Sequence, residues 1–126
     1  MAVYLKRVYD AVSPTDGKRI LVDRLWPRGI AKEEATWVQW AKDASPSPQL
    51  RKWFAHQVDR FDLFRIRYEE ELANDPVKQQ IIKQLREDAS NGILTLVYAA
   101  KNETCNHAII LREWLIDDHR VVEKKS

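Results

Sequence analysis

Charged and aromatic side chains gather in one short stretch of the chain, directly after a run of apolar residues at positions 20–22. The stretch holds an acid, Asp23, two guanidinium groups, Arg24 and Arg28, and an indole, Trp26. A continuous apolar run is typical of a strand that is covered on both faces. Because ligands of open α/β sheets bind just beyond the carboxyl ends of strands, we predict a site at this position.

A second polar segment follows the clearest strand of the chain, which is predicted over residues 93–98. It contains Lys101, Cys105, Asn106 and His107, and the last three fall in the opening turn of a predicted helix. Free backbone N–H groups and the helix dipole favour an anion there. If the two strands are parallel neighbours, their loops share one edge of the sheet and form one crevice.

This crevice would hold two arginines, one lysine and a helix N-terminus. Such a group of donors would suit a phosphate or a carboxylate. We therefore predict that the protein acts on or binds an anionic, phosphate-bearing small molecule or nucleotide, and the residues leave open whether it is an enzyme. Two residues are predicted to be catalytic, His107 as acid or base and Asp23 as the group that orients an arginine or a histidine. Five are predicted to bind the substrate: Arg24, Trp26, Arg28, Lys101 and Asn106.

Simpler structural roles are open for the same residues. The two arginines could serve only to hold a loop by pairing with nearby acids, because structural ion pairs are common. The acids within reach in the sequence are Asp23, Glu33 and Glu34. An indole before a proline is typical of a packing anchor, and the histidine of the second loop could serve no chemistry at all.

A second function also stays open, namely a non-catalytic module that binds nucleic acid or a protein through the loop from Trp26 to Arg28. An indole between cations is typical of surfaces that bind single-stranded nucleic acid. The basic patch would combine six residues: Lys6, Arg7, Lys18, Arg19, Arg24 and Arg28. Acidic residues elsewhere make this the less favoured alternative.

Cys105 invites a nucleophilic role, because a thiol at a helix N-terminus can act as a nucleophile. Thiol phosphatases and sulfur transferases, however, need a run of small residues that wraps the anion, followed by a spaced arginine. Here an apolar helix follows instead, so we interpret Cys105 as a bystander. The three histidines lack the spacing of metal ligands, and no glycine-rich nucleotide fingerprint is present. We therefore expect neither a metal nor a cofactor.

Composition restricts the class of protein. With 126 residues, 44% of them hydrophobic and 32% charged, the chain suits one soluble domain with its own core. A net charge of +2 does not by itself imply nucleic-acid or membrane binding. No apolar run is long enough for a membrane span or a signal peptide. One cysteine excludes an intrachain disulfide, so we expect a cytoplasmic protein whose oligomeric state the sequence does not give.

Periodicity and capping residues predict the elements that would position the site. Strands are expected over residues 3–8, 18–23 and 93–98, and helices over 32–42, from 48 after a Ser47 cap, across 61–72, over 76–90 after an Asp75 cap, and from about 105. The inner face of the 76–90 helix is predicted to hold Val77, Ile81, Ile82, Leu85 and Ala89. The short gap between the first two strands favours an antiparallel hairpin. We expect one α/β domain over residues 1–120 and a flexible tail over 121–126.

Several motifs together resemble the YeaO-like branch of the domain-of-unknown-function 488 family (DUF488). The resemblance covers nearly the whole chain. It is carried by Arg7-Val8-Tyr9-Asp10, by the block Leu-Val-Asp-Arg-Leu-Trp-Pro-Arg-Gly at 21–29, by Trp40-x-Lys42, by Pro46-Ser47-x-x-Leu50-Arg51-Lys52-Trp53-Phe54-x-His56, by Phe64-x-x-x-Tyr68-x-x-Glu71-Leu72, by residues 94–101, and by Asn106-His107-Ala108.

This resemblance implies a compact three-layer α/β sandwich with a small, mainly parallel sheet and helices on both faces, and it implies no assigned reaction. More distant members of the family carry Cys-His-Arg near the start of the last helix, where this chain has Asn106-His107-Ala108. The family pattern therefore gives no support to a cysteine-based mechanism.

Overall fold

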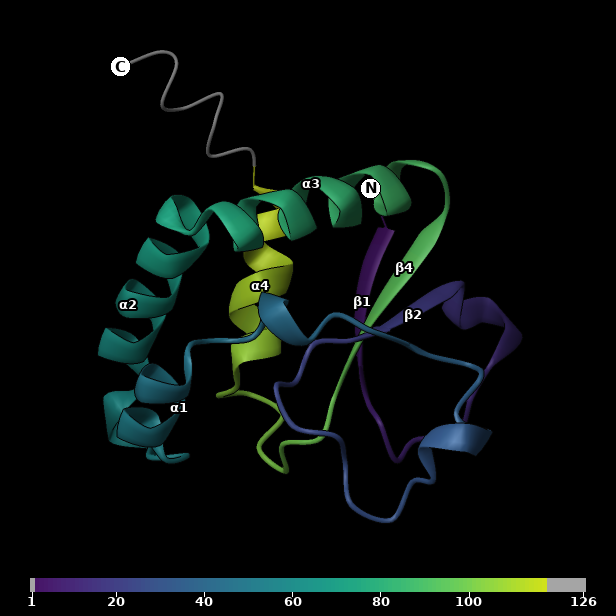
Figure 1. Cartoon of the computed structure of the whole chain (residues 1–126), viewed down its shortest axis with the longest axis horizontal. Coiled ribbons are helices and arrows are strands. Elements are labelled where there is room, and N and C mark those ends of the chain that lie inside the picture. The colour runs from purple at the N-terminus through teal and green to yellow at the C-terminus, as the bar shows by residue number, and fades with distance from the viewer. Residues whose placement is uncertain (1, 118–126) are drawn as a thin grey trace.

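The computed structural model describes residues 2–117, which form a four-stranded sheet flanked by helices (Figure 1). The strands are β1 (Ala2–Arg7), β2 (Lys18–Leu21), β3 (Gln39–Trp40) and β4 (Ile93–Tyr98). Their order is β1-β4-β2-β3, and every neighbouring pair is parallel. The predicted α/β class with a mainly parallel sheet is confirmed. The tail predicted over 121–126 lies outside the described residues.

The antiparallel hairpin predicted for the first two strands is wrong. β4 lies between β1 and β2 and runs parallel to both of them, with Leu5 beside Leu96 on one side and Ile20 beside Leu96 on the other. The connection between β1 and β2 contains a single 3₁₀ turn, η1 (Pro14–Asp16), and carries the chain past the place that β4 later fills. The length of a gap does not show that a later strand will be inserted into it.

Capping residues correctly mark the starts of two of the described α-helices. The α-helices are α1 (Pro48–Phe54), α2 (Phe61–Asn74), α3 (Pro76–Ser90) and α4 (His107–Ile116). Ser47 accepts a hydrogen bond from the N–H of Leu50, and Asp75 accepts one from Val77. Both caps are followed by proline at the first helical position, where its missing N–H costs nothing. The predicted starts of α1 and α3 are therefore confirmed.

One face of the sheet carries the main core of the protein. Leu94, Leu96 and Tyr98 alternate along β4 and contact buried residues of the helices, among them Phe64 and Leu111. In Figure 1 the helices lie to the left of and above the strands, whereas the loop that carries the 3₁₀ turn η2 (Lys32–Glu34) lies at the lower right. The period of two along β4 explains how one strand serves two separate cores.

The opposite face is covered by tryptophans from the segment that follows β2. Leu21 and Val97 point to this side and pack against Trp26, Trp37 and Trp40. Within residues 2–117, no residue of an α-helix belongs to this second cluster. The third layer of the sandwich is therefore built from loop and 3₁₀ turns around an aromatic filling.

The helix predicted over residues 32–42 is wrong. The segment forms η2, the short edge strand β3 and another 3₁₀ turn, η3 (Lys42–Ala44). The indole N–H of Trp40 donates to the carbonyl oxygen of Asp23 at 2.7 Å, and the N–H of Ala41 donates to that of Leu21 at 2.8 Å. Packing and strand pairing against β2 outweigh the helical spacing of the tryptophans.

The inner face of α3 differs from the prediction at its first turn. Ile82, Leu85 and Ala89 are buried as predicted, but Val77 is 54% exposed. The neighbouring Lys78 is buried instead, because its ammonium group donates to the carbonyl oxygen of Asp43 at 3.0 Å. This lysine attaches α3 to η3, a role that hydrophobic periodicity does not reveal.

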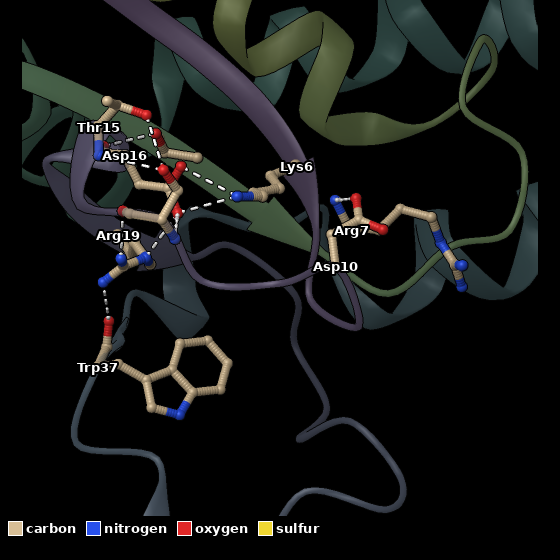
Figure 2. A network of polar contacts seen from close by, with 9 residues as sticks. Lys6, Arg7, Asp10, Thr15, Asp16, Arg19 and Trp37 are labelled. Atoms are coloured by element: carbon tan, nitrogen blue, oxygen red, sulfur yellow. Dashed lines mark hydrogen bonds and ion pairs between the residues drawn. The ribbon is translucent and has the colours of Figure 1, made fainter.

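The turn before β2 depends on the lack of a side chain at Gly17. Its φ is +65°, in the region that favours glycine, and a Cβ there would lie 2.3 Å from the carbonyl oxygen of Ile93. The preceding residue, Asp16, accepts hydrogen bonds from Lys6 and from Arg19, at 3.1 Å and 2.9 Å (Figure 2). Its backbone carbonyl accepts the buried hydroxyl of Thr95 at 2.7 Å. Asp16 thus connects the start of β2 to both β1 and β4.

Acid is expected to weaken the protein through Asp16. Burial alone would raise the pKa of this carboxyl, but the Ser13 N–H and the Arg19 and Lys6 side chains outweigh it and lower the pKa from 3.8 to about 2. A lowered pKa contributes stability above the unfolded-state value, and this stability is lost as the pH falls from about 4 to about 2. In urea unfolding curves, Asp16→Asn should cost about 1–2 kcal/mol at pH 7. The difference in free energy of unfolding between Asp16→Asn and wild type should shrink at pH 2. A difference that stays constant between pH 7 and pH 2 would contradict the stabilising role of the Asp16 carboxylate.

Candidate anion-binding site

The ends of β2 and β4 are joined through the carboxylate of Asp23. Pairing continues just past β2, where the N–H of Val22 donates to the carbonyl oxygen of Val97 at 3.0 Å. Asp23 Oδ2 then accepts the backbone N–H of Ala99 at 2.9 Å. The predicted strand over 18–23 therefore ends two residues early as a regular strand, and its last residue serves as a clamp between two loops.

His107 attaches the first turn of α4 to the same place. Its Nε2 lies 2.9 Å from the carbonyl oxygen of Val22 and 3.2 Å from Asp23 Oδ1. A carbonyl oxygen can only accept, so Nε2 carries the hydrogen and acts as a donor. Asp23 Oδ1 is buried and has no hydrogen bond of good geometry, which leaves the imidazole as its polar neighbour.

Asn106 is the N-cap of α4, which begins two residues later than the predicted start near Cys105. Its side-chain oxygen accepts the N–H of Ile109 at 3.0 Å, and its amide group donates to the carbonyl oxygen of Asn102 at 2.8 Å. Asn102 in turn accepts the N–H of Cys105 at 3.0 Å. These bonds hold the loop over residues 102–106 against the start of α4.

These loops surround a cavity of about 650 Å³, a size common for small-molecule sites. All seven residues predicted for the site line it: Asp23, Arg24, Trp26, Arg28, Lys101, Asn106 and His107. The structure brings them together because parallel neighbours place both loops at the same edge of the sheet. Their catalytic and binding roles stay predictions.

Positive charge predominates in the lining. Four side chains in it are permanently cationic, and the one carboxylate is Asp23. Arg24 is engaged with the carbonyl oxygen of Pro46 at 3.3 Å and, more loosely, with Asp43 at 3.7 Å. The other three cations have no ion pair or side-chain hydrogen bond within the described chain: Arg28, Arg51 and Lys101. The cavity therefore presents unneutralised donors to solvent.

The structure agrees only in part with the simpler structural roles that were open for the arginines and the tryptophan of the first loop. Arg24 pairs with Asp43 and not with the acids expected from the sequence. Trp26 does serve as a packing anchor, since its ring lies edge-on to Trp40 with centroids 5.3 Å apart and its N–H donates to the carbonyl oxygen of Ile30 at 2.7 Å. The same indole lines the cavity, so the two roles coexist. Cys105 is not among the lining residues and packs against the main core.

Sequence reasoning missed the contribution of α1 and the residues that follow it. Arg51 and His56 line the cavity, as does Phe54 between them. The helix ends with Ala55 and His56 both in the left-handed region, at φ 48° and 58°. The signal that could have found them is the motif Leu50-Arg51-Lys52-Trp53-Phe54-x-His56 within the family resemblance, which places a cation and a histidine around a helix end.

A glycine at position 55 should stabilise the protein. Ala55 follows α1 and donates its N–H to the carbonyl oxygen of Arg51 at 3.0 Å, a position that glycine usually takes. Relief of the left-handed strain outweighs the extra freedom of glycine in the unfolded chain, so Ala55→Gly should add about 0.5–1 kcal/mol. Urea unfolding of Ala55→Gly beside wild type measures the change. A loss of stability would show that the helix end is not strained.

Within residues 2–117, no three acidic, histidine or cysteine side chains gather in a way that could hold a metal ion. In the same part of the chain, no helix has the length and apolar character needed to cross a membrane.

Comparison with known proteins agrees with the motifs around this cavity. A family model described as the inactive DUF488-N3 subclade matches residues 2–126. The chain belongs to the DUF488 family. It is 47% identical over 115 residues to the uncharacterised protein YeaO of Escherichia coli, a match that spans 91% of this chain and 97% of YeaO. An uncharacterised protein of Mycobacterium tuberculosis is 40% identical over 113 residues, 90% of this chain and 92% of that protein.

These matches confirm the predicted place of this DUF488 protein in a YeaO-like branch. No solved structure matches the chain significantly. Asn106 is a buried cap, His107 faces the end of β2, and Ala108 is fully buried in the main core.

Proposed function

We propose that this DUF488 protein binds a phosphate-bearing small molecule or nucleotide in the cavity at the carboxyl ends of β2 and β4. One observation carries the proposal: three partnerless cations, Arg28, Arg51 and Lys101, converge with Arg24 on a cavity whose lining holds a single carboxylate. Guanidinium groups match the geometry of phosphate oxygens, and charge-assisted bonds are the strongest that side chains form. Exposed cations that share one cavity and lack a counter-ion favour an anionic occupant.

Binding without turnover is the form of this function that we favour. The Nε2 of His107 donates to the carbonyl oxygen of Val22, so this nitrogen is engaged in holding the fold. Asp23 is engaged likewise with Ala99. Ala108, the position at which the family resemblance implies an arginine in more distant members, is fully buried. The description of the subclade as inactive is in keeping with a binding protein derived from an enzyme.

The nucleic-acid alternative has less support, because most of the predicted basic patch is engaged inside the molecule. Lys6 and Arg19 both contact Asp16. Arg7 donates to the carbonyl oxygens of Ala99 and Ala100 at 3.1 Å and 3.0 Å. Lys18 lies 3.1 Å from Asp88, and Arg24 is paired as described above. Of the six cations, Arg28 alone lacks a partner for its side chain in the described chain.

Removal of a cavity cation is expected to weaken phosphate binding. Thermal-shift measurements would first test nucleoside 5′-phosphates and sugar phosphates, and calorimetry would then measure the affinity of those that stabilise the protein. Arg28→Ala should lower that affinity about 10–100-fold, the loss of one or two charge-assisted bonds. Lys83→Ala removes an equally exposed cation from α3, outside the cavity lining, and serves as the matched control. Equal affinities of Arg28→Ala and wild type would refute the proposal.

A further inference from the structure

Cations reach the cavity from two separate parts of the chain. Arg28 and Lys101 come from the loops that follow β2 and β4, and we call this pair the loop arm. Arg51 and His56 come from α1 and the turn after it, and we call this pair the helix arm. In Figure 1, α1 lies on one side of the loop over residues 99–106, and the chain that follows β2 lies on the other.

Apolar surface contributes to the lining beside these arms. Phe54 and Phe64 are stacked, with ring centroids 4.1 Å apart and planes at 15°, and both line the cavity. Leu25 lines it as well and is 61% exposed. Apolar and aromatic walls with a few placed polar groups are the usual surroundings of the non-ionic body of a ligand.

The volume exceeds what one phosphate group fills. A water molecule takes about 30 Å³ of liquid, so a cavity of about 650 Å³ has room for roughly 20 waters. Each arm holds two nitrogen-bearing side chains, enough to hold one phosphate or carboxylate. The one acid in the lining, Asp23, accepts a hydrogen bond from Ala99, lies beside His107 and has no ion pair with either arm in the described chain.

The backbone at His56 agrees with a role for its side chain. Two consecutive residues in the left-handed region cost free energy that glycine would avoid, and Ala55 and His56 both adopt it. The imidazole of His56 makes no hydrogen bond or ion pair within the described residues, yet it lines the cavity. The nitrogens of His56 are therefore free to meet a ligand, whereas Nε2 of His107 is engaged.

From this arrangement we infer that the ligand carries two separated anionic groups, one held by the loop arm and one by the helix arm, on a body that lies against the apolar wall. This inference rests on the proposed function and narrows its ligand class to bisphosphates, or to phosphate esters that also carry a carboxylate. A monophosphate would satisfy one arm and leave the other without a counter-ion.

Matched pairs of probes test the inference. Calorimetry would compare adenosine 3′,5′-bisphosphate with adenosine 5′-monophosphate, and fructose 1,6-bisphosphate with fructose 6-phosphate. In at least one pair the bisphosphate should bind wild type tenfold tighter or more. In Arg51→Ala, the ratio of the bisphosphate affinity to the monophosphate affinity should fall toward one. Arg51→Lys should restore part of this ratio. Lys52→Ala, an exposed cation on α1 that does not line the cavity, should keep the wild-type ratio.

Two further variants separate the side chain of His56 from its strained backbone. His56→Gly and Ala55→Gly both relieve a left-handed residue, but only His56→Gly should reduce the bisphosphate advantage. Thermal unfolding of each variant confirms that it is folded. If monophosphates bind and Arg28→Ala weakens them, but neither pair shows a bisphosphate advantage, the two-armed ligand is refuted and the proposed function stands. If neither the monophosphates nor the bisphosphates bind, the two-armed ligand and the proposed function are both refuted.

Discussion

Replacement of Tyr68 by alanine is expected to lower the free energy of unfolding by about 3–5 kcal/mol, the usual cost of removing a buried aromatic ring. Tyr68 is fully buried in α2. Its ring contacts Phe64 and lies edge-on to His107, with centroids 6.1 Å and 6.3 Å away, and its hydroxyl donates to the carbonyl oxygen of Ala44 at 2.5 Å. The loss would be a large share of the stability of a domain of this size.

Tyr68→Phe separates the hydroxyl from the ring. This variant keeps the ring contacts but leaves the carbonyl oxygen of Ala44 unpaired, so about 1–2 kcal/mol should be lost. Urea unfolding of both variants beside wild type gives the two numbers. A Tyr68→Phe variant as unstable as Tyr68→Ala would show that the hydroxyl, and not the ring, carries the effect.

Replacement of Asp23 by asparagine is expected to cost about 2 kcal/mol, although it barely changes the shape of the side chain. Both neighbours of the carboxylate carry N–H groups: the N–H of Ala99 donates to Oδ2, and Nε2–H of His107, which donates to the carbonyl oxygen of Val22, lies 3.2 Å from Oδ1. An asparagine can accept from only one of them, so in either orientation its amide group faces a donor. The clamp between β2, β4 and α4 would then be broken at one of its two ends.

Asp43→Asn is the matched control for this change, because it removes the same charge near the same cavity. Asp43 is 59% exposed in its side chain and has one loose ion-pair partner, Arg24, at 3.7 Å. Exposed pairs of this kind contribute little, so stability should change by less than about 0.5 kcal/mol. Urea unfolding curves compare the two variants. Equal stability of Asp23→Asn and wild type would mean that the carboxylate of Asp23 is not needed to hold β2, β4 and α4 together.

The sequence predicts the parts of this fold that depend on local chemistry. Ser47 and Asp75 mark helix starts because a cap and the proline after it act within a few residues. The strand over 93–98 is recognised because it is apolar on both faces. The site residues could be gathered in advance for a related reason: parallel neighbouring strands place their following loops at one edge, whatever else surrounds them.

Tertiary packing decides the parts that the sequence did not predict. Trp37 and Trp40 have helical spacing, but Trp37 lies in a turn and Trp40 in β3, and both pack against the second face of the sheet. Arg51 and His56 look like an ordinary helix end until α1 is seen beside the strand ends. The buried Lys78 donates a hydrogen bond to the carbonyl oxygen of Asp43, which lies 35 positions away in the chain. None of these partners is within reach of a local pattern.

The strand order also determines when the sheet can form. β1 pairs only with β4, and β2 pairs with β4 and the two-residue β3, so nearly all of the ladder waits for residues 93–98. On the ribosome, the amino-terminal strand emerges long before its partner, and α1, α2 and α3 are complete while β1 is still unpaired. Such distant pairing slows folding and leaves strand edges open to other chains. A nascent chain that stops short of Ile93 would therefore carry helices and lack nearly all of the sheet, and β4 is the segment whose arrival completes the sheet.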